Sequence, residues 1–275
     1  MNIKIISDSS ANMTGLTQVP FASVPLHIIV DNQNFVDDPS ADLQAVDHAL
    51  AHCKSSSTAC PAIGDWLEAF GEAENIFCVT ITSSLSGCYS SAQMAKEDYE
   101  EHYPDRHVYL IDSLSVGPEM MLIVEKLQEL ILQGMSAPDI YREIQEYTKH
   151  THLLFSLESL RNMAKNGRVN PAVAKLAGVL GIRVVGQASM EGELEVLGKC
   201  RGEKRALSSI IKTMKEKGYQ GGKVRIAHNQ NEKAALQLKA MIQDDFSSAD
   251  VQLHTTGALC SYYAEKGGLL LGFAH

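Results

Sequence analysis

The chain is short of positive charge and of long apolar stretches. Its 275 residues contain 24 Lys and Arg against 33 Asp and Glu, which gives a formal net charge of −9. A nucleic-acid binder needs a basic face, so this balance excludes that class, and it also disfavours standing attachment to an anionic membrane. No apolar run approaches the roughly 20 residues that span a bilayer, so we expect no stable membrane insertion.

Paired cysteines are also lacking. The six cysteines are scattered, and none forms a C-x-x-C pair. This pattern is typical of free thiols in a reducing compartment. The chain enters a strand-like segment at once, without the basic and then apolar start of a signal peptide. We therefore expect a cytoplasmic protein.

Several catalytic and cofactor motifs are missing. The sequence contains neither G-x-G-x-x-G nor G-x-x-x-x-G-K-[ST], the nucleotide-binding fingerprints, and it lacks the nucleophile elbow G-x-S-x-G. His48 and His52 have the four-residue spacing of a metal site, but the Glu of H-E-x-x-H is absent. An exposed helix face is the simpler interpretation of this pair. We expect no metal and no cofactor.

The first half of the chain alternates short apolar segments, rich in β-branched residues, with longer helical patterns. Strands are predicted at 4–7, 24–30, 76–82 and 107–112, and helices at 41–53, 64–73, 86–102, 118–135 and 138–149. This alternation predicts a mostly parallel sheet with flanking helices.

The pattern changes near residue 150, and the segment 149–152 (KHTH) is interpreted as a linker. Two strand-like runs, 182–188 and 194–200, flank a turn that contains Gly192, which predicts a hairpin. Helices are expected at 171–180, 203–217 and 231–243, strands at 223–228 and 251–256, and an apolar segment closes the chain. The sequence predicts an α/β protein of two domains, 1–150 and 151–275, the second with a mixed sheet.

Small hydroxyl residues follow three of the predicted strands. Ser9, Ser84 and Ser113 lie just beyond strand ends, near helix starts. In open α/β sheets ligands bind at the carboxyl ends of strands, where free amides and the helix dipole favour an anion. Each group alone is explained by helix capping. Together they predict a shared anion pocket with these three serines at its rim.

Ser86 lies in the richest of these junctions. A nucleophilic serine needs a base within hydrogen-bond reach, and no histidine belongs to this junction. We interpret its hydroxyl as a ligand to an oxyanion. Two other classes stay open: an acyl hydrolase or transferase that uses Ser86, and a binder of a small anionic metabolite.

The order of short motifs resembles the DegV family of bacterial lipid-binding proteins over nearly the whole chain. The stretch 83–92 (SSLSGCYSSA) is close to the family's S-S-x-L-S-G-T-Y-x-S-A. SDSS at 7–10 resembles T-D-S-S, and TACPA at 58–62 resembles T-S-Q-P-S. Further resemblances are DS at 112–113, LESL at 157–160 with NGRV at 166–169, and KCRG at 199–202.

This resemblance implies a two-domain fold that binds one long-chain fatty acid. The acyl chain would lie in a buried tunnel, and Thr58, Ser86 and Gly87 would bind the carboxylate near the domain interface. Some family members carry the lipid for an ATP-dependent fatty acid kinase subunit, which phosphorylates the carboxylate. The resemblance therefore implies a non-catalytic lipid-transport protein, with such a kinase subunit as a candidate partner.

The C-terminal motif departs from the family pattern. A family histidine, followed by G-P-G two residues later, lies beside the carboxylate. Tyr263 takes its place here, and residues 265–267 (EKG) replace G-P-G. A tyrosine hydroxyl can donate a hydrogen bond but carries no positive charge near neutral pH. Arg168 and Arg201, in the motifs at 166–169 and 199–202, are expected to face a partner, unless they are merely solvated surface.

Overall fold

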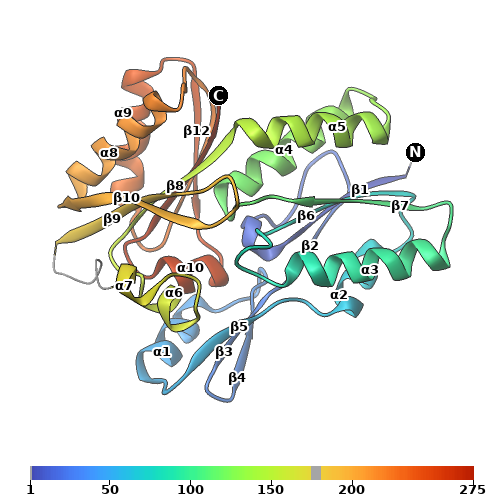
Figure 1. Ribbon diagram of the computed structural model, residues 1–275, viewed down its shortest axis with the longest axis horizontal. Coiled ribbons are helices and arrows are strands. Elements are labelled where there is room, and N and C mark those ends of the chain that lie inside the picture. Colours follow the sequence, from blue (N-terminus) through green and yellow to red (C-terminus); the bar gives the residue numbers. More distant parts are fainter. Residues whose placement is uncertain (1, 175–180) are drawn as a thin grey trace.

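The computed structural model describes residues 2–174 and 181–275. Within these ranges the chain forms three β-sheets, labelled A, B and C below, with helices packed on them (Figure 1). Sheet A is parallel and sheet C is mixed, so the predicted fold class is confirmed. No helix in the described ranges is long and apolar enough to cross a bilayer.

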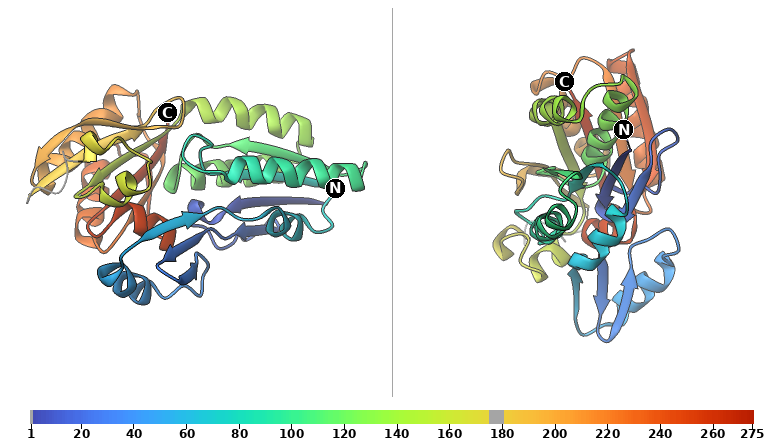
Figure 2. Two further views of the ribbon diagram at one scale, coloured as in Figure 1. Left: turned by 60° about the horizontal axis from the view of Figure 1, so that its bottom comes forward. Right: turned by 90° about the vertical axis from the view of Figure 1, so that its right-hand side faces the viewer.

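Sheet A has the strand order β2-β1-β6-β7. Its strands are β1 (Ile3–Asp8), β2 (Phe21–Val24), β6 (Asn75–Thr80) and β7 (His107–Asp112). Helices α2 (Ile63–Phe70) and α3 (Cys88–His102) cover one face, and α4 (Pro118–Leu132) and α5 (Ala137–Tyr147) cover the other (Figures 1 and 2). Burial on both faces explains the nearly continuous apolar run of β6.

Sheet B is antiparallel and was not foreseen from the sequence. It contains β3 (His27–Val30), β4 (Gln33–Val36) and β5 (Ser56–Ala59), with α1 (Leu43–His52) between β4 and β5 in the chain. The single strand predicted over 24–30 was wrong, because β2 ends before Pro25 and the chain then enters another sheet. Proline has no N–H for a sheet ladder, so a strand breaks there.

Sheet C has the order β10-β9-β8-β13-β11-β12. Its strands are β8 (Thr151–Leu157), β9 (Ile182–Ala188), β10 (Leu194–Arg201), β11 (Gly222–His228), β12 (Ala249–Thr255) and β13 (Leu269–Ala274). Helices α8 (Glu203–Glu216) and α9 (Glu232–Asp245) pack on one face. The short helices α6 (Arg161–Lys165) and α10 (Ala258–Ala264) contribute to the apolar cluster on the other.

Three predictions for the second half of the chain have different outcomes. The hairpin is confirmed, because β9 and β10 pair antiparallel. The linker at 149–152 was wrong: a 3₁₀ turn, η2 (Thr148–His150), leads directly into β8. Of the helix predicted over 171–180, the structure shows α7 (Pro171–Ala174), and residues 175–180 lie outside the described residues.

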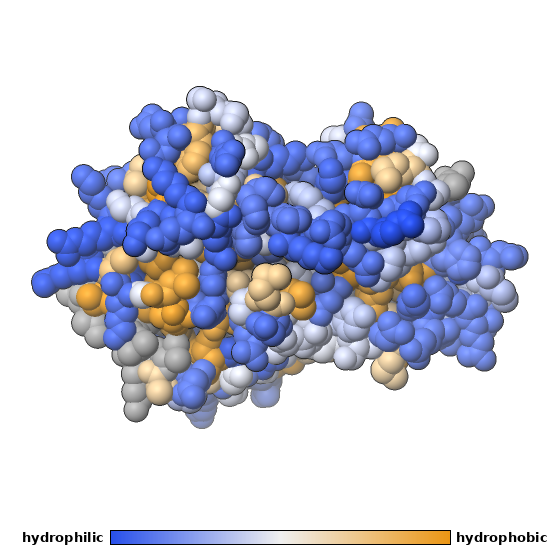
Figure 3. Space-filling view, turned by 45° about the horizontal axis from the view of Figure 1, so that its top comes forward, coloured by the Kyte–Doolittle hydropathy of each residue, from blue (hydrophilic) through white to orange (hydrophobic). Residues whose placement is uncertain are grey.

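Helix α4 lies between sheets A and C. It contacts β1 and β6 on one side and β11 and β13 on the other. Every residue from Pro118 to Val124 is buried, including the carboxylate residue Glu119, because this end of the helix is covered on both sides. The surface is mostly hydrophilic on the face in Figure 3, where apolar residues show only in patches. The domain division at residue 150 stays a prediction.

Candidate functional site

An apolar cavity lies where the carboxyl ends of the sheet A strands meet sheet C and α10. It is narrow, with about 60 Å³ of room for water-sized molecules. Its apolar lining residues come from all parts of the chain: Leu26, Ile81, Leu85, Val116, Leu153, Phe155, Met163, Leu194, Leu259, Cys260, Ala264 and Leu270. The polar lining residues are Thr58, Ser86, Arg168 and Tyr263.

Strands β8 and β13 form one wall of the cavity. Leu153 and Phe155 are two residues apart on β8, so their side chains point to the same face. Leu270 of β13 pairs with Phe155 in the sheet. Gly186 of β9 lies directly behind the Phe155 ring, and a Cβ there would overlap that ring. The absence of a side chain at Gly186 therefore allows the ring to lie against β9.

The four polar lining residues gather at one end. Thr58 Oγ1, on β5, lies 2.8 Å from the hydroxyl oxygen of Tyr263, on α10. Arg168 donates from Nε to the carbonyl of Leu85 at 3.0 Å, which places its guanidinium beside the loop that carries Ser86. Burial raises the pKa of Tyr263, while the Thr58 hydroxyl and the charge of Arg168 oppose that rise. The cavity thus has one polar, positively charged end.

Ser86 lies in the loop between β6 and α3, with Gly87 as the N-cap residue of α3. The Ser86 hydroxyl donates to Cys88 Sγ at 3.1 Å, and its oxygen accepts from the Cys88 amide at 3.3 Å. A Cβ at Gly87 would lie 3.4 Å from Cys60 Sγ, so the backbone here approaches the residue that follows β5. This approach brings Ser86 to the end of the cavity that Thr58 lines.

The structure brings together only part of the predicted site. Thr58, Ser86 and Tyr263 line one cavity, and Gly87 adjoins it. Arg168, expected to face a partner, is half-buried and lines the same cavity. Arg201 is exposed at the end of β10.

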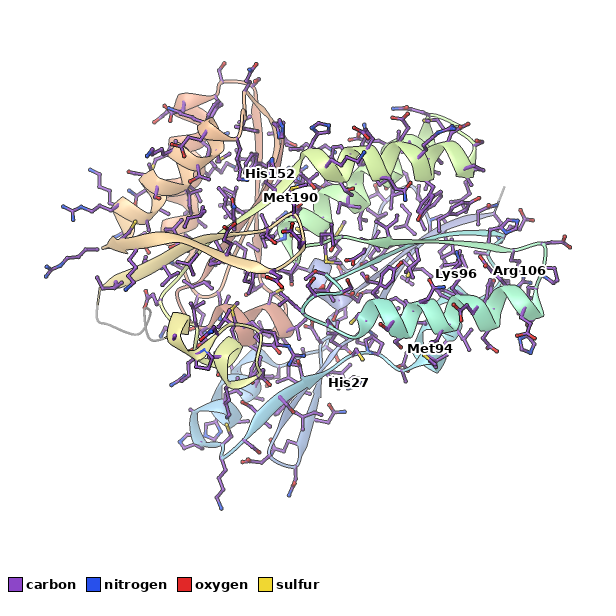
Figure 4. The ribbon with its side chains drawn as sticks, in the orientation of Figure 1. His27, Met94, Lys96, Arg106, His152 and Met190 are labelled. Atoms are coloured by element: carbon purple, nitrogen blue, oxygen red, sulfur yellow. The ribbon has the colours of Figure 1, made fainter. Side chains whose placement is uncertain are left out.

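Ser9, Ser84 and Ser113 do not line this cavity. Ser9 accepts the Leu26 amide at 3.0 Å and faces a different cleft. Ser84 donates to the carbonyl of Glu191 at 2.6 Å. Ser113 donates to the carbonyl of Ser115 at 3.1 Å and lines a third cleft with His152 and Met190, which are labelled in Figure 4. The structure does not bring these three strand ends into a shared anion pocket.

The sequence reasoning missed the apolar lining. The alternation of Leu153 and Phe155 could have indicated one face of a strand, but not that the face borders a cavity. Leu26 and Val116 lie in loops, where no periodic pattern applies.

The histidine pair on α1 adds nothing to this cavity. His52 Nδ1 lies 2.9 Å from the carbonyl oxygen of His48, as in an ordinary helix-surface hydrogen bond. Across residues 2–174 and 181–275, no group of three or more His, Cys, Asp and Glu is placed to hold a metal ion.

The chain, with an apolar cavity that has one polar end between a parallel and a mixed sheet, belongs to the DegV family. A family model described as "Uncharacterised protein, DegV family" matches residues 2–274. DegV domain-containing proteins of Streptococcus pneumoniae and Streptococcus gordonii are 44% and 41% identical to the chain, and each alignment covers 99% of both proteins.

Solved structures also match the chain over nearly its whole length. A DegV family protein from Eubacterium eligens, loaded with heptadecanoic acid, is 44% identical with a TM-score of 0.97, over 99% of each chain. The Streptococcus pneumoniae Fatty Acid Kinase (Fak) B3 protein, loaded with linoleic acid, is 43% identical with a TM-score of 0.97, over 100% of this chain and 99% of that one. A Ruminococcus gnavus family member with vaccenic acid is 27% identical with a TM-score of 0.91, over 99% and 100%.

Proposed function

We propose that this protein binds one long-chain fatty acid, with the acyl chain in the apolar cavity and the carboxylate at its polar end. The observation that carries the proposal is the confinement of Thr58, Ser86, Arg168 and Tyr263 to one end of an otherwise apolar cavity. Each CH₂ removed from water contributes about 0.8 kcal/mol, so the chain supplies most of the affinity. The relatives loaded with heptadecanoic and linoleic acid support the same ligand class.

The polar end suits a carboxylate by its charge and its donors. Hydroxyls of Thr58, Ser86 and Tyr263 can donate hydrogen bonds without ionising at neutral pH. Arg168 supplies the positive charge, and two backbone carbonyls, of Leu85 and Asn166, hold its guanidinium in place. Hydrogen bonds between ionised groups are about twice as strong as neutral ones. In this proposal the positive charge of Arg168 neutralises the carboxylate of the fatty acid. Tyr263 cannot supply such a charge.

The protein acts as a carrier rather than an enzyme in this proposal. Among the hydrogen bonds of the described residues, the Ser86 hydroxyl has a thiol and an amide as partners, and no imidazole or carboxylate. A serine without a base is a poor nucleophile. The similarity to the Fak B3 protein supports a role in presenting the fatty acid to a kinase subunit. The cytoplasmic location stays a prediction from the sequence.

Mass spectrometry of the purified protein tests the proposal. Under native conditions we expect a mass increase of one fatty acid, which denaturation releases. Ser86→Ala should lower the affinity for added oleate about tenfold, because a hydrogen bond to a charged group is worth roughly 1.5–3 kcal/mol. Ser84→Ala is the matched control, since that hydroxyl bonds to Glu191 outside the cavity.

Two outcomes would contradict the proposal. A protein that is purified without lipid and takes up neither oleate nor palmitate binds something else, and a small polar anion would then be the better ligand class. Equal affinities for the two serine variants would remove Ser86 from the carboxylate site.

A further inference from the structure

A network of three polar side chains lies behind the polar end of the cavity. It consists of Ser56 on β5, Tyr262 on α10 and Asn166 at the end of α6 (Figure 1). The hydroxyl oxygen of Tyr262 lies 2.9 Å from Ser56 Oγ and accepts a hydrogen bond from Asn166 Nδ2 at 2.7 Å. None of these three residues lines the apolar cavity, so the proposed function gives the network no direct contact with the ligand.

Each residue of this network stands one or two positions before a polar lining residue of the cavity. The pairs are Ser56 and Thr58, Tyr262 and Tyr263, and Asn166 and Arg168. The same three segments of the chain therefore carry both the network and most of the polar end. A shift of one segment against another would move a residue of each set. A network that ties the segments together thus also fixes the geometry of the polar end.

Two asparagine amides hold α6 to α10. Asn162 and Asn166 are four residues apart, so they lie on one side of the helix. Asn162 Nδ2 donates to the backbone carbonyl of Tyr262 at 2.8 Å, and Asn166 Nδ2 donates to the carbonyl of Asn162, also at 2.8 Å. Tyr262 is therefore bonded through both its backbone and its hydroxyl. Because Tyr262 is only 1% exposed, the loss of one of these bonds leaves a buried polar group without its partner.

The turn that ends α6 leads from this network to Arg168. The amide of Arg168 donates to the carbonyl of Met163 at 2.8 Å, and the amide of Gly167 donates to the carbonyl of Ala164 at 3.1 Å. With Gly167 at φ +73°, this is the Schellman pattern that closes a helix. Arg168 Nη1 also donates to the backbone carbonyl of Asn166. The backbone and the guanidinium of Arg168 are thus both tied to the turn that the Asn166 side chain anchors.

We infer that Asn166 and Tyr262 are positioning residues, which hold the Arg168 guanidinium at the polar end before a ligand binds. This inference rests on the proposed function, because it assigns both residues a role in binding the carboxylate of a fatty acid. An arginine side chain has many rotamers, and fixing one of them at the moment of binding costs conformational entropy. Because the turn is already anchored, most of that cost falls on folding, and the affinity for a carboxylate is higher.

Displacement of a fluorescent fatty acid from the full chain, by oleate and by methyl oleate, tests this role. Asn166→Ala and Tyr262→Phe should each raise the Kd for oleate about three- to tenfold. The Kd for the uncharged methyl oleate should stay nearly unchanged, a difference between ligands that a general loss of stability does not produce. Tyr219→Phe is the matched control, because this tyrosine is 2% exposed and its hydroxyl donates to the carbonyl of Gly222 at 2.9 Å, outside the cavity lining.

The same two substitutions in an Arg168→Gln background decide whether the network acts through Arg168. There they should have no further effect on oleate binding, because the side chain that they position is gone. If the full effect persists in that background, or if the single variants bind oleate as the wild type does, the inference is overturned while the proposed function stands. A wild type that binds no oleate overturns the proposed function, and this inference with it. If Tyr262→Phe fails to fold, the half-buried Asn166 decides the matter through Asn166→Ala.

Discussion

The hydroxyl oxygen of Tyr263 lies 2.8 Å from Thr58 Oγ1, and this contact joins residues 205 positions apart in the sequence. One comes from α10, next to sheet C, and the other from the edge strand β5 of sheet B. Each hydroxyl can donate one hydrogen, so one of the two donates to the other and the second is left to donate to a ligand. The pair is therefore a single donor unit at the polar end of the cavity.

Removal of either hydroxyl should weaken fatty-acid binding, and the two losses should not add. Tyr263→Phe and Thr58→Val each leave one hydroxyl without its partner. We expect each to raise the Kd for oleate by about tenfold. Groups in one hydrogen-bonded unit couple by roughly 0.5–3 kcal/mol in a double-mutant cycle. Displacement of a fluorescent fatty acid measures the oleate affinity of the wild type, the two single variants and the double variant. Strictly additive effects would show that the two hydroxyls act separately.

Arg168 and Arg201 should behave differently although both belong to motifs expected to face a partner. Arg168→Gln removes the positive charge from the cavity and should raise the Kd for oleate tenfold or more. The effect should shrink for an uncharged ligand such as methyl oleate. Arg201→Gln, on the exposed end of β10, should leave lipid binding unchanged. The same loss in both variants would mean that Arg168 acts through the net charge of the protein.

Gly186→Ala should disturb the cavity wall. The added Cβ overlaps the ring of Phe155 and the carbonyl oxygen of Glu195, so the ring must move into the cavity. Overpacking of this kind costs about 1–3 kcal/mol, and lipid affinity should fall with it. Gly198→Ala on β10 is the control, since a Cβ there meets nothing within 4 Å. Urea unfolding gives the stability difference, and equal stabilities would contradict the close contact.

Glu119 should make the folded protein less stable as the pH rises. Burial raises its pKa from 4.5 to about 7, although hydrogen bonds from Ser115 and Thr151 oppose the rise. Between about pH 4.5 and 7 the folded state keeps a proton that the unfolded state has released. The stabilising contribution is thus complete below pH 4.5 and is lost as the pH passes 7. At about 1.4 kcal/mol per pKa unit, the loss is at most ~3.5 kcal/mol.

Comparison with Glu119→Gln isolates this effect. The amide cannot ionise, so the variant should gain stability relative to the wild type between pH 5 and 8, as measured by urea unfolding at each pH. Glu143→Gln, at an exposed position on α5, should run parallel to the wild type. If the Glu119 variant instead becomes less stable relative to the wild type as the pH rises, the pKa shift has the opposite sign. The ionised carboxylate would then be stabilised in the folded protein.

Local patterns predicted most elements of the fold but not sheet B. The β-branched runs of β1, β6 and β7 and the periodic helices between them are strong local signals, and the structure confirms them. Strands β4 (QNFV) and β5 (SSTA) are four residues long and partly exposed. Such short segments carry little hydrophobic pattern, and their strand form depends on pairing with β3.

The sequence by itself determined most of the elements, the alternating order that leads to a parallel sheet, and the motif at 83–92 that contains Ser86 and Gly87. These features depend on near neighbours in the chain, through side-chain period, helix capping and backbone freedom. Only the tertiary structure decided that Arg168 lines the cavity while Arg201 is exposed, and that Ser9, Ser84 and Ser113 do not line it. Those outcomes depend on contacts between residues far apart in the sequence, which no local pattern records.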